Sequence, residues 1–432
     1  MILEIQPAQA FRLEATKIAS DKSISHRSVI FSLLSNQTSK IKNYLQGEDT
    51  LNTLEIAKNL GLQVKTEGDT LLLTPSQEIL EPKGILECGN AGTAIRLYVG
   101  LLSAQKGLFV LSGDCYLNER PMKRVTEPLK NIGAEIYGRD EGNLAPLVIR
   151  GKGGLSPFCY ESKIASAQIK SAMILNALFA KGECEYFEPE LSRNHTEKML
   201  GGMGAEIECF RKGNKEGVKV SPLKEKLKPL EIEIPADPSS AFFFAVALAI
   251  CPNSRGILRN VLLNPTRIEA FKILEKMGVK IIYYETSKIY ETIGDIEIIA
   301  PNELQGVKVC EKISWLIDEI PALAIAMACA KTPSQVRNAK ELRVKETDRI
   351  KAVVDNLRLC GIEAREFDDG FEILGGTFKK AKLSSYGDHR IAMSFAIAGL
   401  KSGMIITEAQ YINISFPNFL DILGQITTYS TQ

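Results

Sequence analysis

The residues best suited to chemistry are cations and hydroxyls that stand just before apolar helical runs. The segment Asp21-Lys22-Ser23-Ile24-Ser25-His26-Arg27 leads directly into the apolar stretch 29–34. Unpaired backbone N–H groups and the helix dipole favour anions at such a helix start, and phosphates above all. Lys22 adds a compact charge and Arg27 a planar fork, so the two could hold a multiply charged small ligand. For any single segment of this kind, a solvated basic cap is the ordinary alternative.

The same arrangement recurs at other helix starts. In Gly89-Asn90-Ala91-Gly92-Thr93-Ala94-Ile95-Arg96, two glycines allow backbone N–H groups to approach an anion without a Cβ in the way. The other such segments are Ser166-Ala167-Gln168, Lys345-Glu346-Thr347-Asp348-Arg349 and Gly387-Asp388-His389-Arg390. One of these alone would be ordinary capping. Five in one chain predict helix N-termini that converge on an anionic site.

Two carboxylates in these regions could handle protons. Asp318 stands just before the apolar run that follows Pro321, where it could cap a helix or accept a proton while cations hold it. Glu346 lies between Lys345 and Arg349, and it could instead make surface ion pairs. The residues themselves leave these alternatives open.

The overall charge excludes several classes of protein. The 432 residues contain 53 basic and 52 acidic side chains, for a net charge of +1. Such a balance argues against a nucleic-acid coat or a membrane-surface protein, which usually have a strong basic excess. The apolar share of 45% and the charged share of 24% are typical of a soluble globular protein. Any basic site must therefore be local.

Cysteines and histidines predict a reduced compartment and no metal. Nine cysteines are scattered without a Cys-x-x-Cys pair, as expected for the cytoplasm. The N-terminus lacks a signal pattern, and the longest strongly apolar run, 241–251, is too short to cross a bilayer. His26, His195 and His389 are isolated from one another, which favours structural hydrogen bonds over metal ligation.

A weak internal period runs through the chain. A helical segment that ends in glycine and continues into an alternating strand recurs at positions 61, 133, 204, 278, 361 and 424, at intervals of 72, 71, 74, 83 and 63 residues. Since 432 divided by six is 72, six copies would fill the chain. Each glycine would be the left-handed residue after a helix. Chance recurrence is the alternative, but the regular spacing predicts repeated supersecondary units.

The apolar runs between these strands predict the layers of the fold. Runs such as 169–180, 241–250, 321–330 and 391–399 are apolar on all sides, so we expect buried helices with sheets outside them. The first strand has no repeat before it and would complete the last unit. We therefore predict an α/β fold of two similar domains. The first comprises residues 1–19 and 237–432, and the second comprises residues 20–236.

Taken together, these motifs resemble the 5-enolpyruvylshikimate-3-phosphate synthase family of enolpyruvyl transferases along essentially the whole chain. Asn118-Glu119-Arg120-Pro121-Met122 and the longer segment 343–349 add to the resemblance. It implies two domains of three βαβαββ units each, an inside-out α/β barrel with the active site in the interdomain cleft. The implied reaction transfers the enolpyruvyl group of phosphoenolpyruvate to the 5-hydroxyl of shikimate 3-phosphate and releases phosphate. This step of the shikimate pathway leads to chorismate and the aromatic amino acids, and it calls for no cofactor or metal.

The resemblance also implies roles for individual residues. Shikimate 3-phosphate would be bound by Lys22, Ser23, Arg27, Ser166, Gln168, Arg193, Asp318 and Lys345. Phosphoenolpyruvate would be bound by Lys22, Gly92, Arg120, Gln168, Arg349 and Arg390. Asp318 would accept a proton, and Glu346 with Lys22 would donate or relay protons.

The chain departs from the family pattern at several positions. Ala167 stands where many members carry a second serine, and Ile414 precedes Ser-Phe-Pro where some members carry a lysine. Gly92 stands where some inhibitor-tolerant members carry alanine, so we expect inhibition by glyphosate. Cys115 lies where the sister UDP-N-acetylglucosamine enolpyruvyl transferase carries a reactive cysteine, which keeps that acceptor as an alternative. Segment 345–349 fits the shikimate enzyme instead, and we interpret the cysteine as a small apolar filler.

Two further classes of function remain as alternatives. A protein that binds or processes RNA ends would need a broad basic face and a catalytic histidine near the C-terminus, and residues 426–432 contain none. A non-catalytic phosphate-binding module would not explain Asp318 and Glu346 together with so many cations. We therefore expect a monomer whose ligands are small anionic substrates, with no nucleic-acid or membrane partner.

Overall fold

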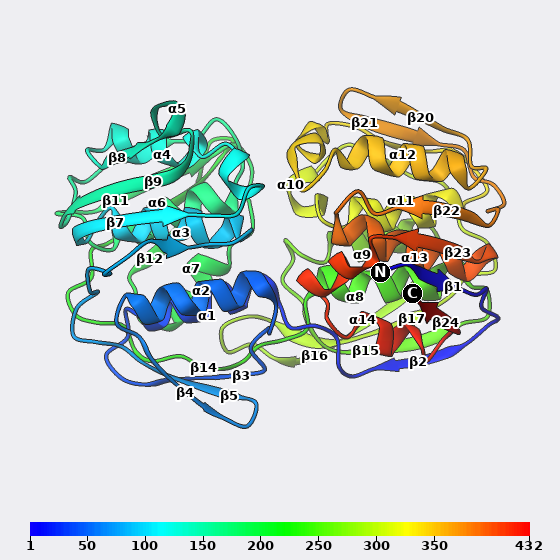
Figure 1. Ribbon diagram of the computed structural model, residues 1–432, viewed down its shortest axis with the longest axis horizontal. Helices are drawn as coiled ribbons and strands as arrows, with labels where there is room; N and C mark the ends of the chain where they lie inside the picture. Colours follow the sequence, from blue (N-terminus) through cyan, green and yellow to red (C-terminus); the bar gives the residue numbers. More distant parts are fainter. The chain divides into compact units, whose positions relative to one another are not determined.

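The computed structural model describes residues 1–432, which form two compact units (Figure 1). Unit 1 comprises residues 1–19, 235–288 and 292–432. Unit 2 comprises residues 20–234 and the three-residue turn Ile289–Glu291. None of the helices combines the length and the apolar character that a membrane-spanning segment needs.

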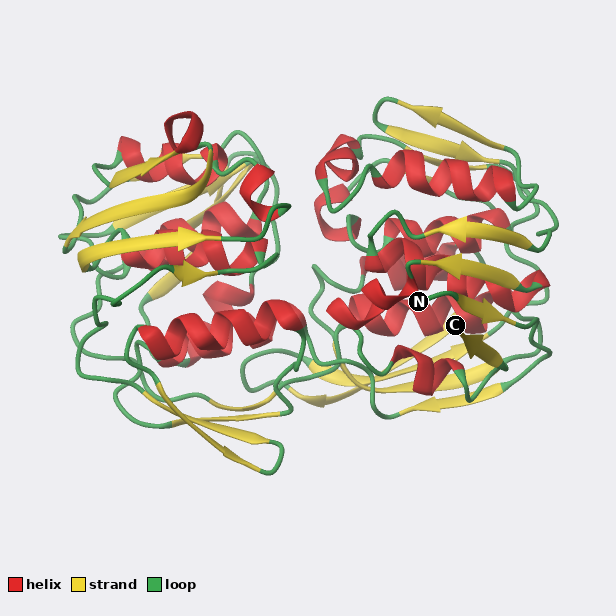
Figure 2. Ribbon diagram, in the orientation of Figure 1, coloured by secondary structure: helices red, strands yellow, loops and turns green.

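Each unit carries three four-stranded sheets, which lie outside its helices (Figure 2). Every sheet contains one parallel and two antiparallel strand pairs, so the six sheets share one design. The sixfold period predicted from glycine spacing is confirmed by this architecture.

The sheets of unit 2 have the strand orders β14-β3-β5-β4, β6-β7-β9-β8 and β10-β11-β13-β12. Their strands are β3 (Ser39–Lys42), β4 (Gln63–Glu67), β5 (Thr70–Thr74), β6 (Leu86–Glu87), β7 (Lys106–Ser112), β8 (Glu135–Gly138), β9 (Leu144–Lys152), β10 (Cys159–Glu161), β11 (Cys184–Glu188), β12 (Ile207–Lys212), β13 (Lys215–Val220) and β14 (Glu231–Glu233).

The sheets of unit 1 have the orders β16-β17-β15-β2, β18-β19-β21-β20 and β22-β23-β1-β24. Their strands are β1 (Leu3–Ile5), β2 (Arg12–Ala15), β15 (Arg255–Leu262), β16 (Lys280–Ser287), β17 (Ile293–Ile299), β18 (Lys308–Val309), β19 (Ser334–Val336), β20 (Ala364–Phe367), β21 (Gly370–Ile373), β22 (Ala381–Ser384), β23 (Met404–Thr407) and β24 (Tyr429–Thr431).

Two edge strands lie in the sequence next to the points where the chain passes from one unit to the other. β2 precedes the first helix of unit 2, yet it pairs in parallel with β15 of unit 1. β14 precedes the first long helix of the C-terminal half, yet it pairs in parallel with β3 of unit 2. The N-terminal strand β1 lies between β23 and β24, with Leu3 opposite both Ile406 and Thr431. The prediction that the first strand completes the last unit is therefore confirmed.

The most apolar helices form the interior of each unit, as predicted (Figure 2). The buried helices are α1 (Lys22–Ser32), α3 (Gly92–Leu102) and α6 (Ala167–Ala177) in unit 2, and α8 (Pro238–Ile250), α11 (Ile320–Ala328) and α13 (His389–Ser402) in unit 1. The helices that flank them are α2 (Glu48–Asn59), α4 (Lys123–Asn131), α7 (His195–Gly202), α9 (Glu269–Lys276), α12 (Arg349–Leu359) and α14 (Phe419–Leu423). Shorter turns are η1 (Leu117–Glu119), α5 (Arg139–Gly142), α10 (Ile313–Leu316), η2 (Lys340–Val344) and η3 (Ala409–Ile414).

The glycines that end the flanking helices behave as predicted in five of the six repeats. Gly61, Gly133, Gly204, Gly278 and Gly361 all have φ between +79° and +102°. The prediction is wrong for Gly424, which has φ −63° and continues the turn of α14. The physical reason is that no local hairpin follows in this repeat, because β1 from the N-terminus pairs with the last strand, β24.

Candidate active site

In unit 2, the first turn of α1 places Lys22 beside a carboxylate. Asp21 caps the helix by accepting a hydrogen bond from the Ile24 backbone N–H at 2.7 Å. The ammonium of Lys22 pairs with Asp49 in the first turn of α2. Lys22 remains partly exposed, whereas Asp49 is buried. A buried carboxylate therefore holds this cation at the helix start, where an anion would also be favoured.

Arg27 lies deeper, one turn further along α1. Its guanidinium donates to Thr196 Oγ1 at 2.8 Å, to Ser171 Oγ at 2.8 Å and to the Ser23 carbonyl at 3.0 Å. Ser171 belongs to α6 and Thr196 to α7, so Arg27 joins the N-terminal parts of three helices. The buried guanidinium thus has a bridging role inside unit 2 that the sequence motif did not indicate.

The start of α3 brings two arginines to a glycine. A Cβ built on Gly92 would lie 2.8 Å from Arg96 Nη1 and 3.4 Å from Arg120 Nη1. Arg120 donates to Asn90 Oδ1, and Asn90 in turn donates to Asp114 Oδ2 at 3.0 Å. The two guanidinium groups thus leave little room for a Cβ at Gly92, and the Gly92 backbone N–H itself donates to the Asn90 carbonyl at 2.8 Å.

The start of α6 lies beside the start of α3. Gln168 Nε2 donates to Thr93 Oγ1 at 3.2 Å. Ser166 occupies the N-cap position with extended backbone, but its side chain makes no capping hydrogen bond. Its hydroxyl is therefore available to a ligand at this helix end. Arg193 is half-buried in the segment that precedes α7.

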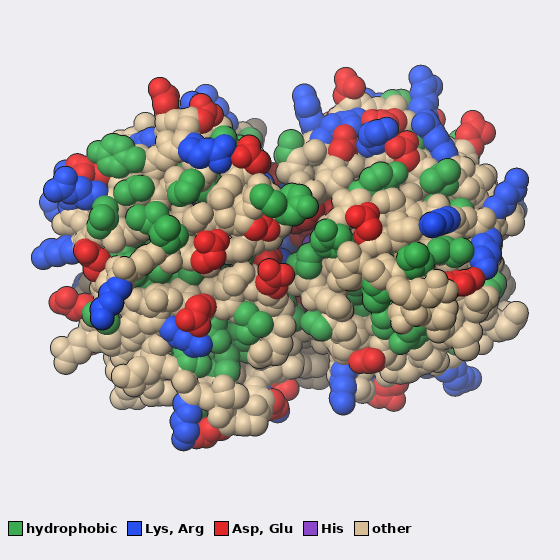
Figure 3. All heavy atoms as spheres, viewed as in Figure 1, with side chains coloured by type: hydrophobic (Ala, Val, Ile, Leu, Met, Phe, Trp, Pro, Cys, Tyr) green, Lys and Arg blue, Asp and Glu red, His purple; other side chains and the backbone are tan.

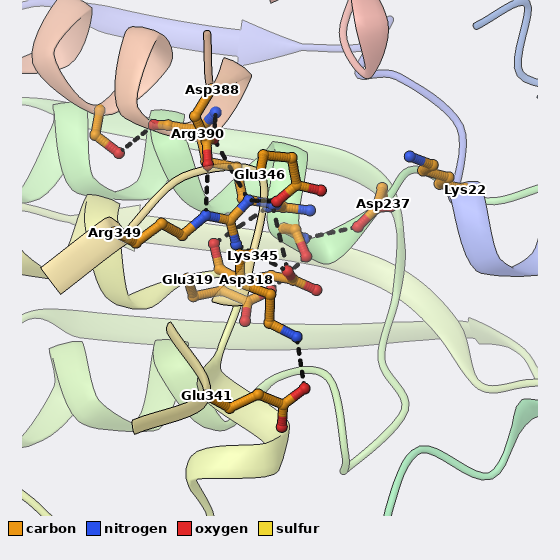
Figure 4. A network of polar contacts seen from close by, with 12 residues as sticks. Lys22, Asp237, Asp318, Glu319, Glu341, Lys345, Glu346, Arg349, Asp388 and Arg390 are labelled. Carbon is orange, nitrogen blue, oxygen red and sulfur yellow. Dashed lines mark hydrogen bonds and ion pairs between the residues drawn. The ribbon is translucent and has the colours of Figure 1, made fainter. Parts of the chain in front are cut away.

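In unit 1, the site residues gather around one buried arginine (Figure 4). Arg349, the first residue of α12, donates from Nε to Asp388 Oδ2 at 2.7 Å and from Nη2 to Glu346 Oε2 at 2.6 Å. Burial disfavours the charged guanidinium, but the carboxylates of Asp388, Glu346 and Asp318 outweigh burial and raise the pKa of Arg349. Arg349 therefore stays charged at every working pH.

Asp318 is held by cations and does not cap a helix. Glu319 occupies the N-cap position of α11, and Asp318 stands just before it. One carboxylate oxygen of Asp318 lies 3.5 Å from Arg349 Nη1 and 3.4 Å from Arg390 Nε. Arg390 also donates to the Asp318 backbone carbonyl at 3.2 Å. Of the two alternatives that the sequence left open, the geometry favours a carboxylate held between cations.

The remaining predicted residues of unit 1 lie in the same segment. Glu346 is partly exposed, but its partner Arg349 is buried, so their contact is not a surface ion pair. Lys345 Nζ donates to Glu341 Oε1 at 2.7 Å (Figure 4). Asp388 caps α13 through the Arg390 backbone N–H at 2.8 Å while it holds Arg349. Asp388 thus links the starts of α12 and α13.

The two sets of residues differ in charge. In unit 2 the predicted residues include the cations Lys22 at the start of α1, buried Arg27 one turn further on, and Arg120 after η1. In unit 1 the carboxylates of Asp318, Glu346 and Asp388 surround Arg349 and Arg390. The first set suits the binding of phosphate groups. The second could bind a carboxylate through arginine and also transfer protons.

The histidines take structural positions in two cases. His26 is buried and shares a hydrogen bond with Thr53 Oγ1 at 2.6 Å. Burial, with help from the charge of Lys22, lowers the pKa of His26 to about 3, so the ring is neutral at pH 7. His195 Nδ1 lies 2.7 Å from Glu291 Oε1, and the same carboxylate accepts from Lys198 at 3.0 Å. His389 begins α13.

The sequence did not indicate several charged and polar residues that hold the predicted site residues or lie at helix starts. They include Asp49 and Asp388, which hold Lys22 and Arg349, and a buried cluster of Asp237, Ser239, Arg267 and Glu319 at the starts of α8 and α11. Asp388 lies inside a motif that had been singled out, so its place at a helix N-cap was a usable signal. Asp237 stands before Pro238, which is the same signal.

Comparison with known proteins gives one consistent family. The family model described as EPSP synthase (3-phosphoshikimate 1-carboxyvinyltransferase) matches residues 9–423. A curated 3-phosphoshikimate 1-carboxyvinyltransferase from a Nitratiruptor species is 60% identical over 424 residues, 98% of each chain. Another from Wolinella succinogenes is 60% identical over 429 residues, 98% of this chain and 97% of the relative.

Solved structures agree with this result. An EPSP synthase from Acinetobacter baumannii superimposes with a TM-score of 0.88 at 35% identity, and the match covers 100% of both chains. The enolpyruvyl transferase NikO from Streptomyces tendae has a TM-score of 0.77 at 14% identity, over 99% of this chain and 98% of NikO, and supports the fold alone. The chain belongs to the EPSP synthase (3-phosphoshikimate 1-carboxyvinyltransferase) family.

Proposed function

We propose that this protein transfers the enolpyruvyl group of phosphoenolpyruvate to the 5-hydroxyl of shikimate 3-phosphate and releases phosphate. The transfer is a step of the shikimate pathway toward the aromatic amino acids. The observation that carries the proposal is Asp318, held between Arg349 and Arg390, in a chain 60% identical to 3-phosphoshikimate 1-carboxyvinyltransferases. A carboxylate placed between two arginines is a candidate to accept a proton.

Shikimate 3-phosphate is bound mainly by residues of unit 2. Its phosphate and hydroxyl groups form hydrogen bonds with backbone N–H groups and hydroxyls at the starts of α1 and α6. Arg193 lies beside the phosphate. Two observations support this assignment. The hydroxyl of Ser166 makes no capping hydrogen bond to α6, and Arg27 joins the helix starts through its hydrogen bonds. The residues assigned to this substrate are Lys22, Ser23, Arg27, Ser166, Gln168, Arg193, Asp318 and Lys345. Arg27 acts mainly by ordering the others, because the guanidinium is buried among protein partners.

Phosphoenolpyruvate is bound by arginines and by the backbone at Gly92. Arg349 and Arg390 suit its carboxylate, since a guanidinium matches a carboxylate with two parallel hydrogen bonds. Arg120 and the start of α3 at Gly92 suit its phosphate. Lys22 and Gln168 complete the set. Both substrates are multiply anionic, and the cations among the assigned residues supply the opposite charge.

The chemistry needs three proton transfers and no redox step. A proton from Glu346 or Lys22 adds to the methylene carbon of phosphoenolpyruvate and makes the adjacent carbon electrophilic. The 5-hydroxyl oxygen attacks that carbon while its proton passes to Asp318. The tetrahedral adduct then breaks its C–O bond to phosphate, which leaves with the bonding electron pair. The group that supplied the first proton, Glu346 or Lys22, takes a proton back from the methyl group, and the double bond is restored. Exclusion of water around the substrates strengthens each of these charge contacts.

A phosphate-release assay tests the activity directly. We expect release when phosphoenolpyruvate is mixed with shikimate 3-phosphate, and none when UDP-N-acetylglucosamine replaces the shikimate compound. The reverse preference would refute the proposal and revive the role of Cys115, which is exposed on the loop before η1. Product identity can be checked by mass, since the acceptor gains the enolpyruvyl group.

Three further properties belong to the proposal. The enzyme is cytoplasmic. It is also a monomer, and size-exclusion chromatography with light scattering can test the oligomeric state. Glyphosate inhibits it. It binds no nucleic acid: on the face seen in Figure 3, acidic and basic side chains are interspersed without a continuous basic area. A gel shift with RNA at physiological salt should therefore show no complex.

A further inference from the structure

Unit 2 contains a buried lysine that the proposed mechanism does not use. Lys170 lies on α6, one turn beyond Ser166, and its Nζ is 2.7 Å from Glu188 Oε1 and 2.8 Å from Glu197 Oε1. The exposed fractions of the three side chains are 0%, 2% and 3%. Burial disfavours the ammonium, but Glu197 and Glu188 outweigh it and raise the pKa of Lys170, so the lysine is charged. Removing such charges from water is unfavourable, so their placement needs a reason.

This cluster holds the backbone of the residue next to Arg193. Lys170 Nζ donates to the Ser192 carbonyl at 3.2 Å, and Glu188 Oε1 accepts from the Ser192 backbone N–H at 2.8 Å. Both backbone polar groups of Ser192 are therefore bound by buried charges. Residues 189–194 lie between β11 and α7, outside any strand or helix. The cluster therefore fixes the backbone of this segment at Ser192, directly before Arg193.

The same cluster connects the helices that carry the other ligands proposed for shikimate 3-phosphate. Lys170 is on α6, which begins after Ser166, and Glu197 is on α7, which begins two residues after Arg193. Thr196, next to Glu197, accepts from Arg27 of α1 at 2.8 Å and shares a 2.6 Å hydrogen bond with Ser171, next to Lys170. Charged and hydroxyl partners thus join the starts of α1, α6 and α7 in one buried network.

We propose that Lys170, together with Glu188 and Glu197, is a positioning residue that fixes Arg193 relative to the start of α6 and thereby sets the affinity for shikimate 3-phosphate. Lys170 itself does not touch the substrate. The proposal rests on the proposed function, in which Arg193 binds the phosphate of that substrate. It distinguishes the two substrates, because Arg193 is assigned to shikimate 3-phosphate alone.

The test is a double-mutant cycle with Lys170→Met and Arg193→Ala. We expect Lys170→Met to raise the KM for shikimate 3-phosphate by roughly 10–100-fold, with kcat and the KM for phosphoenolpyruvate changed by less than about threefold. In the Lys170→Met background, Arg193→Ala should add less than about threefold, because the arginine is already misplaced. Full additivity of the two effects, or a loss confined to kcat, would overturn the proposal.

Two controls separate positioning from general loss of stability. Leu200→Ala removes a buried side chain from α7 and should lower Tm without a selective rise in the KM for shikimate 3-phosphate. Lys219→Met makes the same chemical change at the exposed pair with Glu183 on the neighbouring sheet and should leave both KM values unchanged. A selective KM rise in Leu200→Ala would show that destabilisation alone suffices, and the proposal would be abandoned.

If Lys170→Met does not fold, Glu188→Gln decides. The amide keeps an acceptor for Ser192 and removes one buried charge, so we expect a rise of roughly 3–10-fold in the same KM. An unchanged KM in a folded Glu188→Gln enzyme would count against the proposal. A different outcome concerns Arg193 itself. If the wild type releases phosphate and Arg193→Ala alone leaves the KM for shikimate 3-phosphate unchanged, the role assigned to Arg193 in the proposed function would be refuted.

Discussion

Arg349 donates from Nε to Asp388 Oδ2 at 2.7 Å, and the exposed fractions of the two side chains are only 2% and 0%. This pair links the first residue of α12 to the N-cap of α13. Removal of the Asp388 charge would leave the buried guanidinium with only the more exposed carboxylates of Glu346 and Asp318. The orientation of Arg349 toward a ligand therefore depends on Asp388.

The first prediction concerns this pair. Asp388→Asn keeps an oxygen that can cap α13 but removes the charge that holds Arg349. We expect the KM for phosphoenolpyruvate to rise roughly tenfold or more and Tm to fall, because breaking a buried pair is destabilising by about 3–5 kcal/mol. Steady-state kinetics and thermal unfolding measure both effects. Asp369→Asn, which breaks the more exposed pair with Arg337 in the same unit, is the matched control and should retain full activity.

The second prediction concerns the proton acceptor. Asp318→Asn keeps the shape of the side chain but cannot accept the hydroxyl proton. We expect kcat to fall by roughly 10²–10⁴-fold, the usual contribution of general acid–base catalysis, with much smaller changes in KM. Rapid-quench measurement of phosphate release gives the rate of the chemical step. A kcat within tenfold of the wild type would exclude Asp318 from that role.

The third prediction concerns the space at Gly92. In Gly92→Ala, the new methyl group would lie 2.8 Å from Arg96 Nη1 and 3.4 Å from Arg120 Nη1, so at least one guanidinium must move. We expect a rise of roughly tenfold in the KM for phosphoenolpyruvate and weaker inhibition by glyphosate. Gly84→Ala, where an added Cβ meets nothing within 4 Å, should change neither. Equal inhibition of Gly92→Ala and wild type would place the inhibitor elsewhere.

The fourth prediction concerns the buried neutral ring of His26. Its pKa is about 3 in the folded protein and near 6.5 when unfolded, so below pH 6.5 only the unfolded chain takes up this proton. The neutral ring of His26 therefore contributes fully to the free energy of unfolding above pH 6.5. This contribution is lost as the pH falls toward 3. The slope approaches about 1.4 kcal/mol per pH unit.

Denaturant unfolding of wild type and His26→Asn between pH 7 and pH 4.5 isolates the contribution of His26 to the free energy of unfolding. The asparagine can still bond to Thr53 but does not titrate. The difference between the two proteins should shrink by about 2–3 kcal/mol as the pH falls through this window. Parallel curves would show that His26 is already protonated in the fold.

The fifth prediction uses two glycines three positions apart. Gly204 follows α7 with φ +99°, and Gly201 lies inside α7; an added Cβ meets nothing within 4 Å at either position. Gly204→Ala should destabilise the protein by about 1–2 kcal/mol through backbone strain, whereas Gly201→Ala should stabilise it by up to about 1 kcal/mol. Opposite shifts in Tm would verify that the repeat glycines are selected for conformation. Shifts of the same sign would contradict it.

Local patterns in the sequence predicted the repeat and the helix starts well. Five glycines end helices at positive φ, a conformation that glycine adopts without the steric cost of a Cβ. The apolar runs became interior helices because they have no polar face to expose to solvent. Gly424 shows the limit of such reasoning, since its conformation depends on a strand from the other end of the chain.

The partners of the charged residues could not be predicted in the same way. The choice of Asp49 for Lys22, or of Glu188 and Glu197 for Lys170, depends on which helices pack together and not on spacing along the chain. The turn Ile289–Glu291 is a similar case. Its carboxylate reaches His195 across 96 positions of sequence, and the turn belongs to unit 2 although its flanking strands belong to unit 1.

The position of β1 between β23 and β24 has a consequence for biosynthesis. Leu3 is translated 403 residues before its partner Ile406 (406 minus 3). At roughly 5–20 residues per second, this strand waits on the order of 20–80 s for its neighbours. During that interval the nascent chain can complete residues 20–234, while a short apolar segment at its tip stays unpaired and must be kept from premature association.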